Sequence, residues 1–265
     1  MAGMPDIQSS WIDSPHGKCF AARWRPTEGE ASRSPIVLLH DSLGCVSLWR
    51  EFPARLAAAS GREVIAYDRL GYGRSSPYPG PQPARFIADE AEYFHELRES
   101  FGLAHFVVLG HSVGGGMAVE IAGRHADGCK ALMTVAAQAF TEPRTLAGIR
   151  EAEKAFQNPT AMARLAKHHG AKAEWVLRAW VDTWHSQAFA DWTLDGALQR
   201  VTCPTLAIHG QHDEYGSLAQ PERIATQVAG PAKMAILPCG HVPHRECPET
   251  LIATLLPILA EPASA

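Results

Sequence analysis

Ser112 stands at the centre of the segment with the clearest chemical signal, Gly110-His-Ser-Val-Gly114. An apolar run precedes this segment, and a stretch with helical spacing follows it. A G-x-S-x-G segment between a strand and a helix is typical of a nucleophile elbow, where a sharp turn exposes the serine and the glycines let the two elements approach closely. The helix N-terminus would also direct N–H groups and partial positive charge at the site. The predicted chemistry is nucleophilic attack by Ser112 on a carbonyl carbon.

A serine hydroxyl needs a base that accepts its proton and an acid that orients the base. Asp213 comes shortly after an apolar run, and His241 comes after the last such run of the chain. We therefore predict a triad of Ser112, Asp213 and His241, in the chain order that this type of elbow requires. Glu214 is an alternative acid and His244 an alternative base. We interpret each of these two as a solvated or capping residue, with His244 at the start of the final helix.

An oxyanion formed during acyl transfer needs two N–H donors aimed at one point. Val113, directly after the nucleophile, is predicted to supply one backbone N–H. The loop at residues 40–44, which follows the first buried strand, is predicted to supply the other from Ser42. His209 and His212 flank the predicted acid and are interpreted as structural.

Apolar runs of strand length alternate with segments of helical spacing, which predicts a mostly parallel, doubly wound α/β sheet. A hairpin is predicted at residues 7–25. In such a sheet the ligand site lies at the carboxyl edge of the strands. Buried strands are predicted at residues 35–40, 63–68, 105–110, 129–136, 204–209 and 232–237, and helices at 49–59, 83–101, 112–125, 218–228 and 250–259.

Residues 141–200 interrupt this alternation, because they have helical periodicity and no good strand. We predict a helical cap there, inserted before the strand that carries the acid, over an α/β core of residues 1–140 and 201–265. Most aromatic residues of the cap are expected to form its own small core. Trp180 and Trp184 of the cap, with Asp41 of the core, are the predicted substrate-pocket residues. The concentrated aromatics are Phe156, Trp175, Trp180, Trp184, Phe189 and Trp192.

Composition and charge exclude several classes of partner. The length of 265 residues suits one large α/β domain with an insertion. The net charge is −4 and no Lys/Arg cluster stands out, so neither nucleic acid nor an anionic membrane is an expected partner. No apolar run could span a bilayer, and residues 1–10 do not have the pattern of a secretory signal. The six cysteines lack C-x-x-C spacing, so reduced thiols and a cytoplasmic location are predicted.

No cofactor or metal is predicted. The adjacent His168 and His169 cannot face one ion from a single helix, and no other His, Cys or Asp cluster has metal-ligand spacing. Residues 68–75 (DRLGYGRS) lack the lysine, helix start and glycine spacing of a phosphate loop, so we interpret them as structural, with Gly71 and Gly73 at positive φ. The expected ligand is a small-molecule substrate. A homodimer through the cap or an edge strand is compatible with the sequence, although no residue requires one.

The segments HDSLG, DRLGYGRS, GHSVGG, HGQHDEYG and CGHVPHRE occur in this order from about residue 35 onward. Together they resemble the α/β-hydrolase superfamily. The chain is most similar to capped bacterial serine hydrolases, and more distantly similar to the valacyclovir-hydrolase and haloperoxidase/enol-lactonase groups. The resemblance implies the α/β-hydrolase fold, the same serine triad, and oxyanion donors at Ser42 and Val113.

Two positions depart from the family pattern. Asp41 replaces the glycine that usually follows the histidine of the HGxxG loop, which adds a charge close to the site. Val113 replaces the acidic residue that holds the substrate's amine in valacyclovir-type hydrolases, so no such anchor is expected. The serine nucleophile also argues against haloalkane dehalogenase and epoxide hydrolase, which resemble this fold but use an aspartate there.

These residues predict a carboxylesterase-like serine hydrolase that cleaves a small to medium carboxylic ester, thioester or lactone through an acyl-enzyme on Ser112. The alternative on the same triad is a C–C bond hydrolase or a lyase/cyclase, in which His241 acts as a base without an acyl-enzyme. A ligand-binding protein on a hydrolase scaffold is a third candidate, which the complete triad disfavours.

Overall fold

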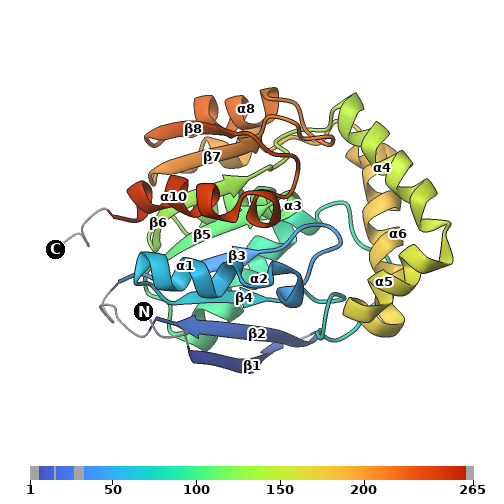
Figure 1. Ribbon diagram of the computed structural model, residues 1–265, viewed down its shortest axis with the longest axis horizontal. Helices are drawn as coiled ribbons and strands as arrows, with labels where there is room; N and C mark the ends of the chain where they lie inside the picture. The colour runs from blue at the N-terminus through green and yellow to red at the C-terminus, as the bar shows by residue number, and fades with distance from the viewer. Residues whose placement is uncertain (1–5, 15, 27–32, 261–265) are drawn as a thin grey trace.

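The central element of the computed structural model is an eight-stranded sheet with helices on both faces (Figure 1). The structure describes residues 6–14, 16–26 and 33–260. The outer ends of the predicted core, residues 1–5 and 261–265, lie outside the described residues. The strands are β1 (Asp6–Ser14), β2 (Gly17–Arg25), β3 (Ile36–Leu39), β4 (Val64–Tyr67), β5 (Phe106–His111), β6 (Cys129–Val135), β7 (Thr205–Gly210) and β8 (Ala232–Leu237).

The order of the strands is β1-β2-β4-β3-β5-β6-β7-β8. β1 and β2 form the predicted hairpin, β2 pairs antiparallel with β4, and the remaining neighbours pair in parallel. β3, β4, β5 and β7 are buried along their whole length, because helices cover both faces of the sheet. This is the predicted α/β-hydrolase fold class, and it brings the carboxyl ends of β3, β5, β6, β7 and β8 to one edge.

The helices of the core divide between the two faces of the sheet. Side chains of α1 and α10 join one apolar cluster, and side chains of α2, α3 and α8 join the other. No helix among the described residues is long and apolar enough to cross a membrane. The core helices are α1 (Phe52–Ser60), α2 (Phe86–Phe101), α3 (Val113–Arg124), α8 (Ala219–Gln227), α9 (Pro243–Glu246) and α10 (Pro248–Leu259).

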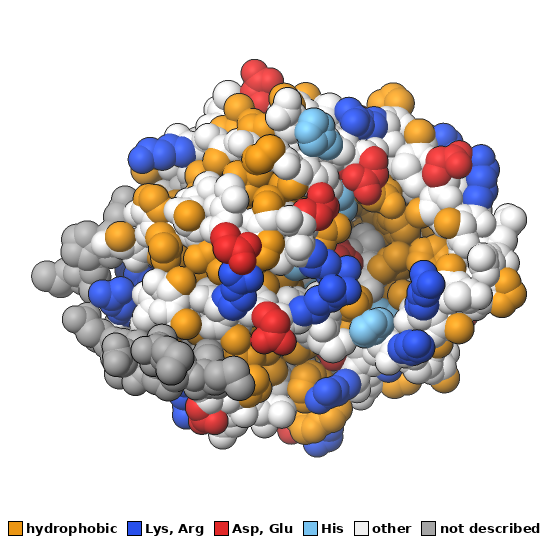
Figure 2. All heavy atoms as spheres, viewed as in Figure 1, with side chains coloured by type: hydrophobic (Ala, Val, Ile, Leu, Met, Phe, Trp, Pro, Cys, Tyr) orange, Lys and Arg blue, Asp and Glu red, His pale blue; other side chains and the backbone are white. Residues whose placement is uncertain are grey.

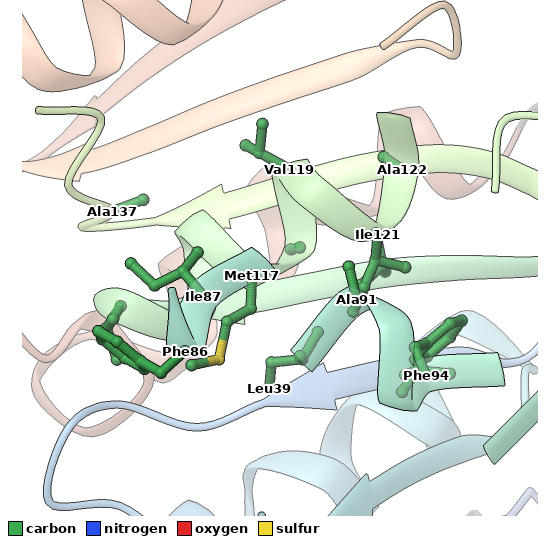
Figure 3. Close-up of a cluster of buried hydrophobic side chains, with 14 of the residues drawn as sticks. Leu39, Phe86, Ile87, Ala91, Phe94, Met117, Val119, Ile121, Ala122 and Ala137 are labelled. Carbon is green, nitrogen blue, oxygen red and sulfur yellow. The ribbon is translucent and has the colours of Figure 1, made fainter. Parts of the chain in front are cut away.

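The second cluster fixes the helix that begins at the predicted nucleophile. Figure 3 shows Phe86 and Ile87 of α2 close to Met117 of α3, with Leu39 of β3 beside them. All four side chains are at most 8% exposed. This packing holds α3 against the sheet directly behind the carboxyl ends of β3 and β5.

One predicted helix differs from the structure. The helical spacing at residues 49–59 is divided between a 3₁₀ helix, η1 (Val46–Trp49), and α1. Arg50 separates the two elements, because its φ of 52° cannot continue either helix. Periodicity alone could not detect this break, since the apolar spacing continues across it.

The loop at residues 68–75 has the predicted structural character. Gly71 and Gly73 have φ values of 90° and 47°. Asp68 accepts hydrogen bonds from the backbone N–H groups of Val46 at 2.6 Å and Arg74 at 2.7 Å. Its carboxylate therefore joins this loop to η1.

Between β6 and β7 the chain forms helices, as predicted for residues 141–200. Figure 1 shows α4, α5 and α6 standing beside the carboxyl edge of the sheet. The boundaries of a separate cap unit remain a prediction, but these three helices are the elements beside this edge. The α7 helix packs instead against the core helices α3 and α8. The helices between β6 and β7 are α4 (Pro143–Phe156), α5 (Pro159–His169), α6 (Ala173–Trp184) and α7 (Asp195–Leu198), with short 3₁₀ turns η2 (Gly170–Lys172) and η3 (Gln187–Phe189).

Candidate active site

Ser112 occupies a strained turn between β5 and α3. Its φ of 55° and ψ of −126° lie outside the regions that side chains usually adopt. Two glycines make the turn feasible. A Cβ atom on Gly110 would lie 2.0 Å from the carbonyl oxygen of Gly114, and one on Gly114 would lie 2.3 Å from that of Leu39. The turn therefore needs glycine at both positions, as expected for a nucleophile elbow.

The three predicted triad residues lie in one line of contacts. His241 Nε2 is 3.0 Å from Ser112 Oγ, and His241 Nδ1 is 2.8 Å from Asp213 Oδ2. The other carboxylate oxygen, Asp213 Oδ1, accepts hydrogen bonds from the N–H groups of Tyr215 at 2.7 Å and Gly216 at 3.0 Å. All three triad residues are buried, and the loops after β5, β7 and β8 supply one each.

The surroundings of Asp213 and His241 shift their pKa values in opposite directions. Burial alone would lower the pKa of His241, but the hydrogen bond and charge of Asp213, with the charges of Asp41 and Glu214, raise it above its ordinary value. Burial alone would raise the pKa of Asp213, but the hydrogen bond and charge of His241 lower it. Asp213 is thus held ionised and can stabilise a protonated His241.

Two backbone N–H groups lie where an oxyanion hole is predicted. In the described part of the chain, the N–H groups of Ser42 and Val113 donate to no protein acceptor. Ser42 lines the same cavity as Ser112, and Val113 begins α3 directly after it. Their function as oxyanion donors remains a prediction, and the unused donors are the observation in its favour.

The Asp41 side chain stabilises the loop that carries Ser42. Asp41 Oδ1 accepts a hydrogen bond from the N–H group of Leu43 at 2.9 Å, and Asp41 Oδ2 lies 3.2 Å from Nδ1 of His111. Burial alone would raise the pKa of Asp41, but the contact with His111 outweighs it and holds the pKa well below its usual range. His111 Nε2 in turn donates to the carbonyl oxygen of His241 at 2.7 Å. Asp41, which stands where the family usually has glycine, therefore connects the loop at residues 40–44 with the elbow at Ser112 and with the loop that carries His241.

The helices beside the sheet edge also hold this loop in place. His169 of α5 accepts a hydrogen bond at Nδ1 from the N–H group of Gly73 at 2.9 Å and donates from Nε2 to the carbonyl oxygen of Leu43 at 3.0 Å. Arg69 donates to the carbonyl oxygen of Asp41 at 2.8 Å.

Among the described residues, no group of three or more His, Cys, Asp or Glu side chains could hold a metal ion.

The local alternatives to the acid and base differ from each other in their surroundings. Glu214 is exposed, as predicted. The prediction that His244 is solvated or capping was wrong. Its ring lies 4.6 Å from the ring of Trp49 and 4.8 Å from that of His111, and it is only 6% exposed. It belongs to α9, one turn before the final helix. His209 is buried and bonds to the carbonyl oxygen of Gly216 at 3.1 Å.

A cavity of about 230 Å³ opens above Ser112. Figure 2 shows a hollow with hydrophobic walls between the α4–α6 helices and the rest of the molecule. The predicted pocket residues Asp41, Trp180 and Trp184 all line the cavity. The ring of Phe189 instead packs against Trp184 at 4.9 Å and stacks on Trp192 at 5.0 Å. The cap aromatics are therefore divided between packing and the cavity, as expected.

Several lining residues were missed from the sequence. Gln138, Thr145, Ile149 and Tyr215 line the cavity together with the triad. Gln138 lies nearest to the chemistry, since its Oε1 is 3.3 Å from Ser112 Oγ. A polar residue just after the strand next to the nucleophile strand is the signal that could have identified it.

By sequence, known curated proteins match only part of this chain. By structure, solved proteins superpose on nearly all of it. The sequence model of a family described as alpha/beta hydrolase fold matches residues 34–246. The (lyso)-N-acylphosphatidylethanolamine lipase of Homo sapiens is 34% identical over 104 residues, which cover 39% of this chain and 30% of the lipase. Proline iminopeptidase of Lactobacillus delbrueckii subsp. lactis is 38% identical over 93 residues, which cover 34% of this chain and 32% of the peptidase. The chain thus spans about a third of the length of these curated relatives.

Among solved structures, the enol-lactonase from Burkholderia xenovorans superposes with a TM-score of 0.71 at 20% identity. This match covers 96% of this chain and 100% of the lactonase chain. A likeness at this identity concerns the fold, and it extends over nearly the whole chain.

Proposed function

Because the chain belongs to the α/β-hydrolase fold family, we propose that it is a hydrolase, which cleaves a small to medium carboxylic ester, thioester or lactone through an acyl-enzyme on Ser112. The observation that carries this proposal is the line of contacts from Asp213 to His241 to Ser112, at 2.8 and 3.0 Å. An aligned acid, base and hydroxyl is the arrangement that activates a serine.

Acylation follows from the positions of these groups. His241 Nε2 accepts the proton of Ser112 as Oγ forms a bond to the carbonyl carbon of the substrate. The carbonyl oxygen becomes an oxyanion, which accepts hydrogen bonds from the N–H groups of Ser42 and Val113. The bond from the carbonyl carbon to the leaving oxygen or sulfur then breaks, and His241 donates its proton to the leaving group.

Water reverses these steps. His241 removes a proton from the water molecule as its oxygen attacks the acyl carbon, and the proton returns to Ser112 Oγ when the carboxylic acid leaves. Asp213 keeps the proton of the neutral imidazole on Nδ1, so that Nε2 is free to accept. The alternative of a C–C hydrolase or lyase uses the same base without an acyl-enzyme, and no contact in the cavity favours it over acyl transfer.

We predict that short acyl esters are preferred over long ones. The cavity of about 230 Å³ is smaller than the roughly 300–1,000 Å³ typical of sites for drug-sized ligands. The kcat/KM for p-nitrophenyl butyrate should therefore exceed that for p-nitrophenyl dodecanoate by about tenfold or more. The measurement is p-nitrophenol release across acyl chains of two to twelve carbons, with detergent present so that all esters stay in solution.

The same series run with Ser112→Ala gives the background for each ester. An optimum at long chains would contradict a site bounded by Trp180 and Trp184. Hydrolysis at equal rates by wild type and Ser112→Ala would contradict the proposed function itself.

A further inference from the structure

Arg69 approaches the loop that carries Ser42 from the side opposite to the nucleophile. In the strand order, β3 lies between β4 and β5. The loop after β3 carries Ser42, the loop after β5 carries Ser112, and Arg69 follows β4. Arg69 is 3% exposed, and Cζ of its guanidinium lies 4.1 Å from the centre of the Tyr72 ring. A buried, charged side chain is therefore held in place directly behind the predicted oxyanion loop.

The carbonyl oxygen of Asp41 is the atom that this side chain binds. Arg69 Nη2 and His40 Nδ1 each donate a hydrogen bond to it at 2.8 Å, and the N–H group of Gly44 donates at 3.2 Å. Burial and the charge of Arg69 lower the pKa of His40 well below its ordinary value, so the ring is neutral and carries one proton. That proton is on Nδ1, since Nε2 accepts a hydrogen bond from the backbone N–H group of Arg69 at 3.2 Å. These donors fix the direction of the carbonyl group.

The direction of this carbonyl group also sets that of the Ser42 N–H group, because both belong to one peptide unit. The peptide bond between Asp41 and Ser42 is trans, so its C=O and N–H bonds point in opposite directions. The carbonyl group points to the β4 side, where Arg69 binds it, and the N–H group therefore points to the β5 side, where Ser112 stands. Ser42 lines the cavity above Ser112, and within the described residues its N–H group has no protein acceptor.

We propose that Arg69 is a positioning residue for the reaction, whose guanidinium holds the Asp41–Ser42 peptide so that the Ser42 N–H group points at the oxyanion. This inference rests on the proposed function and adds to it a residue that lies outside the cavity above Ser112. The contact also strengthens the N–H group as a donor, because a charged donor on the carbonyl oxygen polarises the peptide unit. The stabilisation is greatest in the transition state, where the substrate oxygen gains negative charge.

The test uses Arg69→Met, which removes the charge and the hydrogen bond to Asp41. Removing one oxyanion donor outright costs an enzyme up to about 10³-fold in rate, and a donor that is displaced costs less. The kcat/KM for p-nitrophenyl butyrate should therefore fall about 10- to 100-fold in Arg69→Met. Steady-state p-nitrophenol release on purified protein, with circular dichroism to verify the fold, measures the loss.

Two ketones of equal chain length separate oxyanion positioning from a general disturbance of the cavity. In 1,1,1-trifluoro-2-hexanone, Ser112 Oγ adds to the carbonyl carbon, the hydroxyl proton passes to His241, and the ketone oxygen becomes an oxyanion. Its inhibition constant should rise in Arg69→Met by about the same factor as kcat/KM falls. The inhibition constant of 2-hexanone, which resists attack and forms no oxyanion, should stay within about twofold of wild type.

Two further variants keep the test decisive. Arg69→Gln, which is shorter and uncharged, should show the same losses and serves if the methionine variant does not fold. Arg62→Met is the matched control. Arg62 is 8% exposed and donates to the carbonyl oxygens of Ser34 and Leu259, beyond the amino end of β3. This variant should leave kcat/KM and both inhibition constants within about twofold of wild type.

Three results would overturn the inference in a folded Arg69 variant. They are a kcat/KM within about threefold of wild type, a loss of kcat/KM without weaker binding of the trifluoroketone, and equal weakening of both ketones. Failure of the proposed function is seen separately, as turnover of p-nitrophenyl butyrate by Ser112→Ala at the wild-type rate.

Discussion

Replacing Ser112 with alanine is expected to lower kcat for p-nitrophenyl butyrate by about 10⁴-fold or more. The substitution removes the only atom that can form the acyl-enzyme, Oγ, which lies 3.0 Å from His241 Nε2. Alanine keeps the Cβ atom, so the strained φ of 55° at this position is unchanged and the fold should persist. Steady-state p-nitrophenol release on purified protein measures the loss.

A matched control separates this effect from a general disturbance of the core. Ser60 on α1 is as buried as Ser112, at 7% exposed, and in the described part of the chain its hydroxyl bonds only to Leu56 of its own helix and Arg62 of the turn that follows. Ser60→Ala should keep kcat within about twofold of wild type. If Ser112→Ala retained a tenth or more of wild-type kcat, Ser112 would not be the nucleophile.

Asp213→Asn is expected to lower kcat by about 10³- to 10⁴-fold near neutral pH. The N–H groups of Tyr215 and Gly216, which now donate to Oδ1, would hold the amide oxygen of the asparagine in that place. The amide NH₂ would then face His241 Nδ1 and act as a donor. His241 would be forced to carry its proton on Nε2, where it cannot accept one from Ser112.

The same variant should move the acidic limb of the pH profile. The pKa of His241 is raised above 6.5 in the folded protein, and the base must be neutral to act. Wild-type kcat/KM should therefore be full at high pH and fall as pH decreases through the raised pKa. Asp213→Asn removes the main cause of the increase, so its acidic limb should lie at lower pH. A limb at the same pH in both proteins would contradict the role of Asp213.

The architecture could be predicted from the sequence because each part of it has a local signal. Apolar runs predict buried strands, and Gly110 and Gly114 flank a serine at a strand-to-helix junction. The order of Ser112, Asp213 and His241 then follows from the positions of three loops. In each case the signal lies in the segment that it describes.

What the sequence could not predict depends on contacts between distant segments. His244 was interpreted as solvated, yet it is buried against Trp49, which is almost two hundred positions earlier. Asp41 was noted as a charge close to the site, but its pairing with His111 depends on how β3 and β5 lie side by side. Gln138 was missed because its proximity to Ser112 arises only when β6 pairs with β5.

The most direct test of the central claim is covalent trapping of Ser112. The protein is treated with a fluorophosphonate, its intact mass is measured, and the modified peptide is sequenced by mass spectrometry. We expect one phosphonyl group per chain, attached to Ser112, with loss of ester hydrolysis in proportion to labelling and no label in Ser112→Ala. An enzyme that hydrolyses p-nitrophenyl butyrate yet carries no label on Ser112 would contradict the account, and would favour a reaction in which His241 acts without an acyl-enzyme.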